Sequence, residues 1–185
     1  MLLFWRHGYE ATSLSDLTAA MGVTPPSIYA AFGDKKRLFL KAVGRYLSGP
    51  VTSNSIIAGA ATAREAAEGL LHASACGFTG ADTPPGCLLA SSAISCSAAA
   101  ADVQRELAAI RHGIETQLRD KIVAAIDAGD MTSDADAAAL AAHTMAVIQG
   151  MSTLARDGAT RDKLMSIAAM AMKAWPIRRP RAASR

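Results

Sequence analysis

The chain has 185 residues, of which 51% are hydrophobic and 5% aromatic, and alanine alone supplies more than a fifth of them. This length fits one domain or two small ones, and an alanine-rich chain with few aromatic and β-branched residues favours helices over a β-sheet fold. The net charge of +3 is unevenly spread, because residues 1–50 carry six Lys/Arg against three Asp/Glu and residues 51–175 carry nine against thirteen; the basic N-terminal part is therefore expected to meet a polyanion.

The apolar start of the chain, residues 1–5, does not resemble a signal peptide, because no basic region precedes it and no small-residue cleavage site follows closely. No uninterrupted apolar run approaches the roughly 18 residues of a membrane span. The three cysteines form no CxxC pair. We therefore expect a protein of the reducing cytoplasm with no membrane partner.

The first clear helix pattern covers residues 14–21. Ser13 and Asp16 have the spacing of a capping box, in which each side chain bonds the backbone of the other residue. Gly22 directly follows the helix, where glycine can adopt the left-handed conformation that ends helices. This start and stop predict a helix of about two turns.

Two more helices follow without a long connection. Thr24 has the position of a helix cap, with Pro25 in the first turn where no amide donor is needed, and the helix is expected to end at Gly33. Asp34 caps a third helix that runs to about residue 48, before a Gly-Pro pair. Two short helices joined by a tight glycine turn are typical of a helix-turn-helix, whose second helix can enter a major groove about 12 Å wide.

The rest of the chain predicts a larger helical body. We expect a head over 1–48, a linker over 49–61, a body over 62–175 and a basic, frayed tail over 176–185. The longest helix has an apolar residue at every third or fourth position. The predicted body helices cover residues 62–78, 87–95, 101–128, 134–156 and 160–174, with a loop at 80–86.

The head resembles a known family of regulators. The matching segments are Gly8–Leu14, Met21–Thr24, Ile28-Tyr29 and Phe32–Phe39, and the body segment Pro85–Leu89 matches one branch. With these glycines and aromatic residues at the family's spacing, the chain resembles the TetR/AcrR transcriptional repressors. The resemblance implies an all-α fold, with a three-helix helix-turn-helix head on a helical-bundle body that binds an effector and forms a homodimer.

The resemblance also implies roles for individual residues of the head. Tyr29 and Lys35 would touch DNA phosphates, and Thr12 and Ser13 would lie near the DNA backbone. The residues expected near base edges are Thr24, Pro25, Ser27 and Ala30. Core packing of Tyr29 and a solvated charge run at Lys35–Arg37 are the alternatives, and the Arg-rich tail is expected to be a solvated end.

One departure from the family concerns the first helix. Its members usually have a basic arm and about two further helical turns ahead of the segment that matches Met1–His7. Those turns would cover Leu3, Phe4 and the second helix. We therefore expect a less stable head and a lower DNA affinity than in a longer relative.

The body is expected to hold a pocket for a small apolar or aromatic effector, because its helix faces are apolar with few charges. The candidate lining residues are Phe78, Cys87, Ser91, Ile114 and His143. Two of them have a plainer alternative: a buried cysteine is commonly a small hydrophobic residue, and His143 could be a core or interface histidine.

The last two helices are expected to form the dimer interface. One apolar stripe comprises Leu164, Ile167, Ala168, Ala171 and Trp175, and the other comprises Leu140, Thr144, Val147, Met151 and Leu154. Two such helices from each subunit would give a four-helix bundle about a two-fold axis. The alternative is that both stripes pack inside the monomer.

These features predict a ligand-responsive DNA-binding transcriptional regulator, a repressor that a small molecule releases from a pseudo-palindromic double-stranded operator. The alternative is a helical small-molecule-binding protein whose DNA binding is lost or weakened. An enzyme has no support, because no nucleophile–base spacing, phosphate loop or metal-ligand motif is present. We expect no catalytic residue, no metal and no cofactor.

Overall fold

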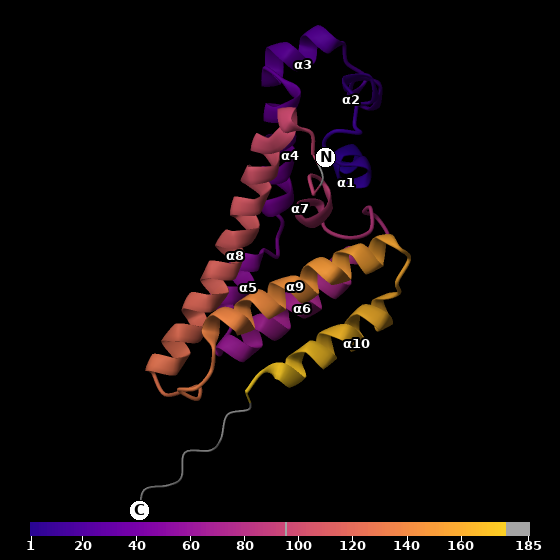
Figure 1. Cartoon of the computed structure of the whole chain (residues 1–185). Helices are drawn as coiled ribbons and strands as arrows, with labels where there is room; N and C mark the ends of the chain where they lie inside the picture. The colour runs from indigo at the N-terminus through magenta and orange to yellow at the C-terminus, as the bar shows by residue number, and fades with distance from the viewer. Residues whose placement is uncertain (95, 177–185) are drawn as a thin grey trace, which may run out of the picture.

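The computed structural model describes residues 1–94 and 96–176, and within these ranges the secondary structure is helical and contains no strand. The expected all-α fold is confirmed. A small group of helices, α1–α3, lies at one end of the molecule, and the long α8 runs from beside it to the far end of the body (Figure 1). The segment 177–185, most of the predicted basic tail, lies outside the described residues.

The head follows the predicted boundaries closely. Its helices are α1 (Leu2–His7), α2 (Leu14–Met21), α3 (Pro25–Phe32) and α4 (Lys35–Leu47). The capping box of Ser13 and Asp16 is present, and Gly22 ends α2 in the left-handed conformation with φ 65°. Asp34 accepts a hydrogen bond from the backbone N–H of Arg37 at the start of α4.

The body helices are α6 (Ala63–Phe78), α7 (Leu88–Ser91), α8 (Ala101–Asp127), α9 (Ala137–Arg156) and α10 (Arg161–Ala171). A 3₁₀ turn at Ala98–Ala100 precedes α8, and another at Met172–Ala174 follows α10. All five were predicted, although α7 is only one turn long. Helices α6, α9 and α10 pack on one another, and α6 and α9 also pack against α8 (Figure 1).

The predicted linker over 49–61 is wrong in part, because it contains the helix α5 (Ser53–Gly59). The Thr52 hydroxyl accepts from the backbone of Ser55 and the Ser55 side chain accepts from the backbone of Thr52, which forms a second capping box. Ile57 of this helix is buried in the body core. A single turn of apolar residues in a small, polar segment is too short to give a periodic pattern.

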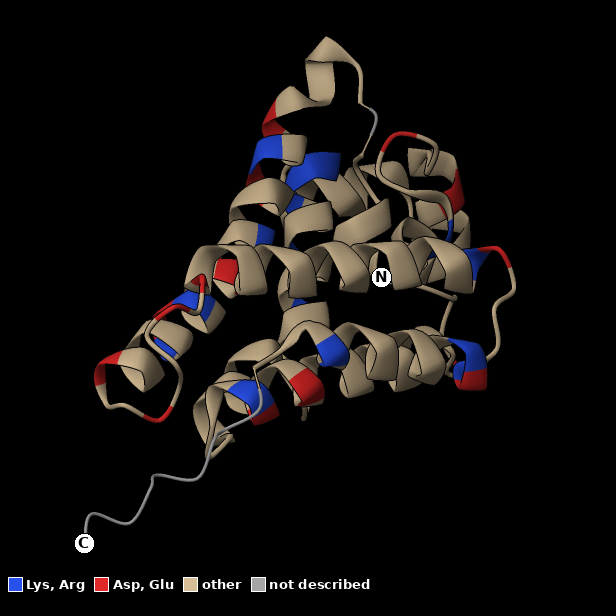
Figure 2. Ribbon diagram, turned by 60° about the horizontal axis from the view of Figure 1, so that its bottom comes forward, with Lys and Arg blue, Asp and Glu red and all other residues tan. Residues whose placement is uncertain are grey.

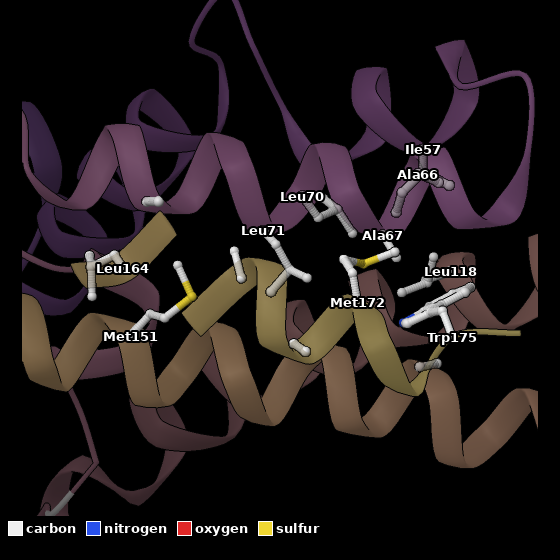
Figure 3. Close-up of a cluster of buried hydrophobic side chains, with 14 of the residues drawn as sticks. Ile57, Ala66, Ala67, Leu70, Leu71, Leu118, Met151, Leu164, Met172 and Trp175 are labelled. Carbon is white, nitrogen blue, oxygen red and sulfur yellow. The ribbon is translucent and has the colours of Figure 1, made fainter. Parts of the chain in front are cut away.

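The head shares its hydrophobic core with the body. Phe4, Leu17, Ile28 and Phe39 pack in one cluster with residues of α7 and the first half of α8, which are Leu88, Leu89, Val103 and Leu107. A second cluster joins α5, α6, α10 and the remaining parts of α8 and α9 (Figure 3). The boundary predicted at residue 48 therefore marks the end of helix α4, but the head on one side of it has no hydrophobic core of its own.

Helix α1 is joined to the body mainly through the segment around α7. The Trp5 indole N–H donates to the carbonyl of Gly86 at 3.0 Å, and the Arg156 guanidinium donates to the carbonyls of Trp5 and Arg6 at 3.1 and 2.9 Å. Gly86 has φ 80°, and a Cβ there would lie 2.7 Å from the carbonyl oxygen of Ser152. Only glycine fits this close approach between the loop and α9.

Several of the apolar side chains of α1 and α2 are covered by the rest of the chain. Phe4 is buried, with its ring 5.1 Å from that of Phe39 in an edge-on arrangement, and Leu3 is half-buried. Leu17, the inward residue of α2, is also buried. Residues within the chain cover Phe4, and the lower stability and DNA affinity of the head stay predictions.

Substituting Trp5 with Phe should destabilise the fold by about 1–2 kcal/mol more than substituting Trp175 with Phe. Both tryptophans are buried, so the two changes remove similar apolar area. Only Trp5→Phe leaves a buried acceptor, the Gly86 carbonyl, without its donor; the Trp175 indole N–H has no partner among the described residues. Urea unfolding followed by circular dichroism measures the difference, and equal losses would show that the Trp5 hydrogen bond adds nothing.

The two stripes expected at a dimer interface face the core of their own subunit instead. Leu164, Trp175 and Met151 are fully buried in the body cluster, where they point towards α6 and its neighbours (Figure 3). Ala168, Ala171 and Thr144 are buried as well, and Leu140, Val147, Leu154 and Ile167 are half-buried against the same cluster. Packing inside the monomer, the alternative, is therefore correct for the buried residues of both stripes, whereas a place at the dimer interface stays a prediction for the half-buried ones.

The opposite face of α9 is exposed and carries no Lys, Arg, Asp or Glu. Its exposed small residues recur every three or four positions and are Ala139, Ala142, Ala146, Gly150 and Thr153. From Ala137 to Ala155 the helix carries no Lys, Arg, Asp or Glu, which Figure 2 shows as an uncharged tan ribbon. Of the described helices, α9 alone is long and apolar enough to cross a membrane by length and composition, but its inner face packs against α6, α8 and α10.

Candidate nucleic-acid interface and ligand cavity

Helix α3 stands out from the head with almost its whole surface free. Ile28 is buried beneath it and Phe32 is half-buried, whereas the other side chains of the helix are exposed. Tyr29 is 51% exposed, so core packing does not account for it. The residues expected near base edges, Thr24, Pro25, Ser27 and Ala30, are all exposed on or directly before this helix.

The turn before α3 is held by side chains as well as by glycine. The hydroxyls of Thr24 and Ser27 lie 3.0 Å apart and form a hydrogen bond, while Thr24 makes no capping bond to the backbone. Helix α2 packs against α3. The two helices thus form a rigid pair that presents short hydroxyl and methyl groups outward, as a major-groove reading helix requires.

Lys35 lies beside this pair, at the start of α4. Its ammonium donates to the Glu10 carbonyl at 3.2 Å and sits 4.7 Å above the ring of Tyr9. Desolvation lowers the pKa of Lys35, with Glu10 opposing that shift. No carboxylate among the described residues lies within 4.0 Å of Lys35, so its charge is positioned but not neutralised.

Thr12 does not reach the surface, which contradicts its expected place near the DNA backbone. Its side chain is fully buried and its hydroxyl donates to the Gly8 carbonyl at 2.6 Å, which closes the chain between α1 and α2. Ser13 is exposed, with its hydroxyl on the Asp16 carboxylate. The sequence pattern could not distinguish a structural hydroxyl from a DNA-facing one.

A salt bridge ties the head to the start of the long helix. The Lys36 ammonium lies 2.5 Å from the Asp102 carboxylate. The hydrogen bond to Asp102 raises the pKa of Lys36 and lowers the pKa of Asp102. Nearby, the Glu10 side chain accepts from the backbone and hydroxyl of Ser97. The first contact therefore joins α4 to the start of α8, and the second joins the segment between α1 and α2 to the segment before α8.

A cavity of about 1200 Å³ lies below the head. Helices α4, α5, α6, α8 and α9 contribute to its wall, together with the ends of α1 and α7. Its lining is mostly apolar and includes Ile56, Leu70, Ile110, Met145 and Ile148. This volume is sufficient for a drug-sized molecule.

Three of the five predicted lining residues are at the cavity: Phe78, Cys87 and Ile114. Ser91 and His143 are not. The Ser91 hydroxyl donates to the Cys87 carbonyl at 2.7 Å, and His143 lies on the exposed face of α9. The error for His143 arises because neither face of α9 carries a charged side chain, so periodicity does not show which one is inner.

Sequence reasoning missed the polar residues of the cavity. Trp5 and Tyr46 line it with their rings 4.9 Å apart, and the Tyr46 hydroxyl donates to the Cys87 sulfur at 3.4 Å. Burial, followed by the effect of Cys87, raises the pKa of Tyr46, so this hydroxyl remains a donor. Arg111 of α8 also lines the cavity. Nothing in the local sequence around these residues distinguishes them from ordinary helix positions.

The described residues gather no group of three His, Cys, Asp or Glu side chains that could hold a metal ion. The cysteines Cys76, Cys87 and Cys96 are free thiols. The described residues offer two sites for binding, an exposed helix at one end and a cavity behind it.

Two family models match the chain. Residues 1–42 match the model "Bacterial regulatory proteins, tetR family", and residues 69–172 match "Tetracyclin repressor-like, C-terminal domain". The first match covers the helix pair with Lys35, and the second covers the greater part of the cavity wall.

Curated and solved relatives agree with these matches. The chain is 34% identical over 179 residues, 95% of its length and 85% of the other's, to the HTH-type transcriptional repressor ComR of Escherichia coli (strain K12). A cysteine mutant of the TetR family regulator CifR, solved with a 26-base-pair operator duplex, superposes with a TM-score of 0.89 and 35% identity over 95% of this chain and 92% of that one. A TetR regulator from Rhodococcus sp. RHA1 gives a TM-score of 0.66 at 35% identity, with 96% and 94% covered.

Proposed function

The chain belongs to the TetR family of bacterial transcriptional regulators, and on this basis we propose that it is a repressor that binds a double-stranded operator and leaves it when a small molecule occupies the cavity. The observation that carries the proposal is the exposed α3, which buries only Ile28 fully and presents its other faces outward. The solved complex of CifR with operator DNA, a relative that covers 95% of this chain, supports it.

In this proposal α3 lies in the major groove. Thr24, Ser27 and Ala30 face base edges, where hydroxyl and methyl groups read hydrogen-bond patterns and thymine methyls. Tyr29 and Lys35 bind phosphates on either side, and such contacts fix the register without reading sequence. Ser13, which is exposed at the start of α2, contacts the DNA backbone in this proposal, whereas the buried Thr12 does not.

The protein acts as a homodimer, and the surface proposed for dimerisation is the exposed small-residue face of α9, together with the outer side of α10. Small side chains allow close helix approach, and the exposed Met170 of α10, with 61% of its surface free, extends the apolar area. A two-fold axis through this face pairs each helix with its symmetry mate and gives a pseudo-palindromic operator.

Helix α4 is the proposed lever between cavity and head. Tyr46 and Leu47 at its end line the cavity, while Leu38 and Phe39 at its start are buried in the head core. The segment of α7 adds a second link, because Leu89 lines the cavity and the Ser92 carbonyl accepts from the backbone of Tyr9. A ligand that shifts either element moves the heads apart or together, so ligand and DNA oppose each other's binding by linkage.

A titration of the dimer with DNA tests this function. Fluorescence anisotropy at fixed salt compares the intergenic DNA upstream of the protein's own gene with a scrambled duplex of equal length. We expect the intergenic DNA to bind at least about 10³-fold more tightly, as specific sites typically do. Equal, weak binding to both would favour the alternative, a cytoplasmic ligand-binding protein without operator recognition.

Replacing Lys35 with alanine should weaken intergenic and scrambled DNA alike, by about tenfold, because a phosphate contact carries no sequence information. The slope of log affinity against log salt should flatten by about one unit per subunit. Lys121→Ala, on the body side of α8, is the control and should change neither. A loss confined to the intergenic DNA would mean that Lys35 reads bases.

A further inference from the structure

The charged side chains in the wall of the cavity differ in how far they are buried. Its charged side chains among the described residues are Arg45, Asp82 and Arg111. Arg45 and Asp82 are exposed at the surface, where water solvates them, whereas Arg111 is half-buried. The inner charge of the cavity is therefore positive.

Arg111 is held in place but not neutralised. Its guanidinium donates one hydrogen bond, to the carbonyl of Leu89 at 2.5 Å. No Asp or Glu among the described residues lies within 4.0 Å of it. A guanidinium has five N–H donors in a planar fork, so most of its donor capacity is free to meet a ligand.

The partial burial of the Arg111 guanidinium raises its free energy as long as no anion pairs with it. Burial lowers the pKa of Arg111, yet a guanidinium stays protonated in proteins. A partly desolvated cation without a partner gains more from an anion than a solvated one does, because less water must be displaced and the local dielectric is lower. Apolar side chains surround the site, including Ile110 and Ile114 on the same helix.

We propose that the ligand of this cavity is an amphiphilic organic anion, with one carboxylate or similar oxyanion bound by Arg111 and an apolar body packed against residues such as Ile114 and Phe78. The inference rests on the proposed function, in which this cavity is the effector site, and it adds an acidic group to the apolar or aromatic effector expected from the sequence. The Leu89 carbonyl holds one edge of the guanidinium, so the fork presents its other edge to a bidentate oxyanion.

Two fluorescent probes with the same aromatic skeleton test it without DNA. Anilinonaphthalene sulfonate carries an anionic group, and N-phenyl-naphthylamine lacks it. We expect wild-type protein to bind the sulfonate at least about tenfold more tightly, as a charge-assisted pair implies. Arg111→Gln should remove that preference and leave the neutral probe within about twofold, while Arg111→Lys should keep part of it.

Arg105→Gln, which removes the same charge from the exposed side of α8, is the control and should leave the preference intact. Equal losses of both probes in Arg111→Gln would mean that Arg111 only positions α7 through Leu89, and an unchanged preference or no binding of either probe to wild type would also overturn the proposal. If Arg111→Gln does not fold, a competition experiment on wild-type protein tests the anion preference instead. Octanoate should displace the sulfonate probe at lower concentration than octanamide does, and equal displacement would contradict the proposal. A protein that discriminates the probes but does not bind its intergenic DNA contradicts the proposed function and leaves the ligand inference standing.

Discussion

Replacing Ala30 with glutamate is expected to lower affinity for the intergenic DNA by at least about a hundredfold. Ala30 is exposed on α3, where a carboxylate would face the phosphates and the acceptor-rich floor of the groove. Like charges brought together at an interface cost several kcal/mol, and the dimer brings two of them. Fluorescence anisotropy at fixed salt measures the loss.

The fold should not change, because exposed substitutions away from special contacts usually shift stability by less than about 0.5 kcal/mol. Ala30→Gln, of the same size without the charge, is the matched control and should lose clearly less affinity. If Ala30→Glu binds the intergenic DNA as wild type does, α3 is not the helix that enters the groove.

Replacing Ala146 with glutamate is expected to convert the dimer to monomers at micromolar concentration. Ala146 lies in the middle of the exposed small-residue face of α9, so a two-fold axis there buries a carboxylate from each subunit without a partner. Burial of an unpaired charge costs several kcal/mol. Light scattering measures the mass, and operator affinity should fall with dimerisation.

Ala109→Glu, on an exposed position of α8, is the control and should remain a dimer. Circular dichroism of the Ala146 variant should stay helical, since its inner face is untouched. The same charge at Ala168, a residue of the stripe first assigned to the interface, would instead damage the core of the monomer, because Ala168 is only 8% exposed. A dimeric Ala146→Glu would place the interface on another surface.

The head was predictable because its local chemistry is explicit. Ser13, Gly22, Gly33 and Asp34 each satisfy a backbone requirement at a helix end, so their spacing fixes the helices without knowledge of the tertiary fold. Helix α5 was not predicted because two adjacent isoleucines in a polar segment show no helical periodicity. Its capping box also has Ser55 at the position where Glu or Gln usually indicates a helix start.

The assignment of faces in the body failed for a physical reason. Helix α9 carries no charged side chain from Ala137 to Ala155, so charge does not distinguish its outer side from its inner side. Small residues also occur on both sides: Ala142 and Ala146 are exposed, whereas Ala141 and Ala155 are buried. The same ambiguity misplaced His143.

The ligand cavity could be predicted only in part. Phe78 and Ile114 follow from helix periodicity, whereas Trp5, Tyr46 and Arg111 reach the cavity from three separate helices. Their proximity depends on how α1, α4 and α8 pack, which no local pattern encodes. Likewise, Thr12 could not be recognised as buried, because its bond to the Gly8 carbonyl depends on the path of the chain between α1 and α2.

The central claim is that two copies of α3 read the major groove, and dimethyl sulfate probing of guanine N7 tests it most directly. That atom lies in the major groove, so a helix seated there blocks its methylation. We expect protected guanines in two half-sites on one face of the intergenic DNA, separated by about one helical turn or a small multiple, and loss of both protections with Ala30→Glu. Unprotected guanines under saturating wild-type protein, or protection that survives Ala30→Glu, would contradict it.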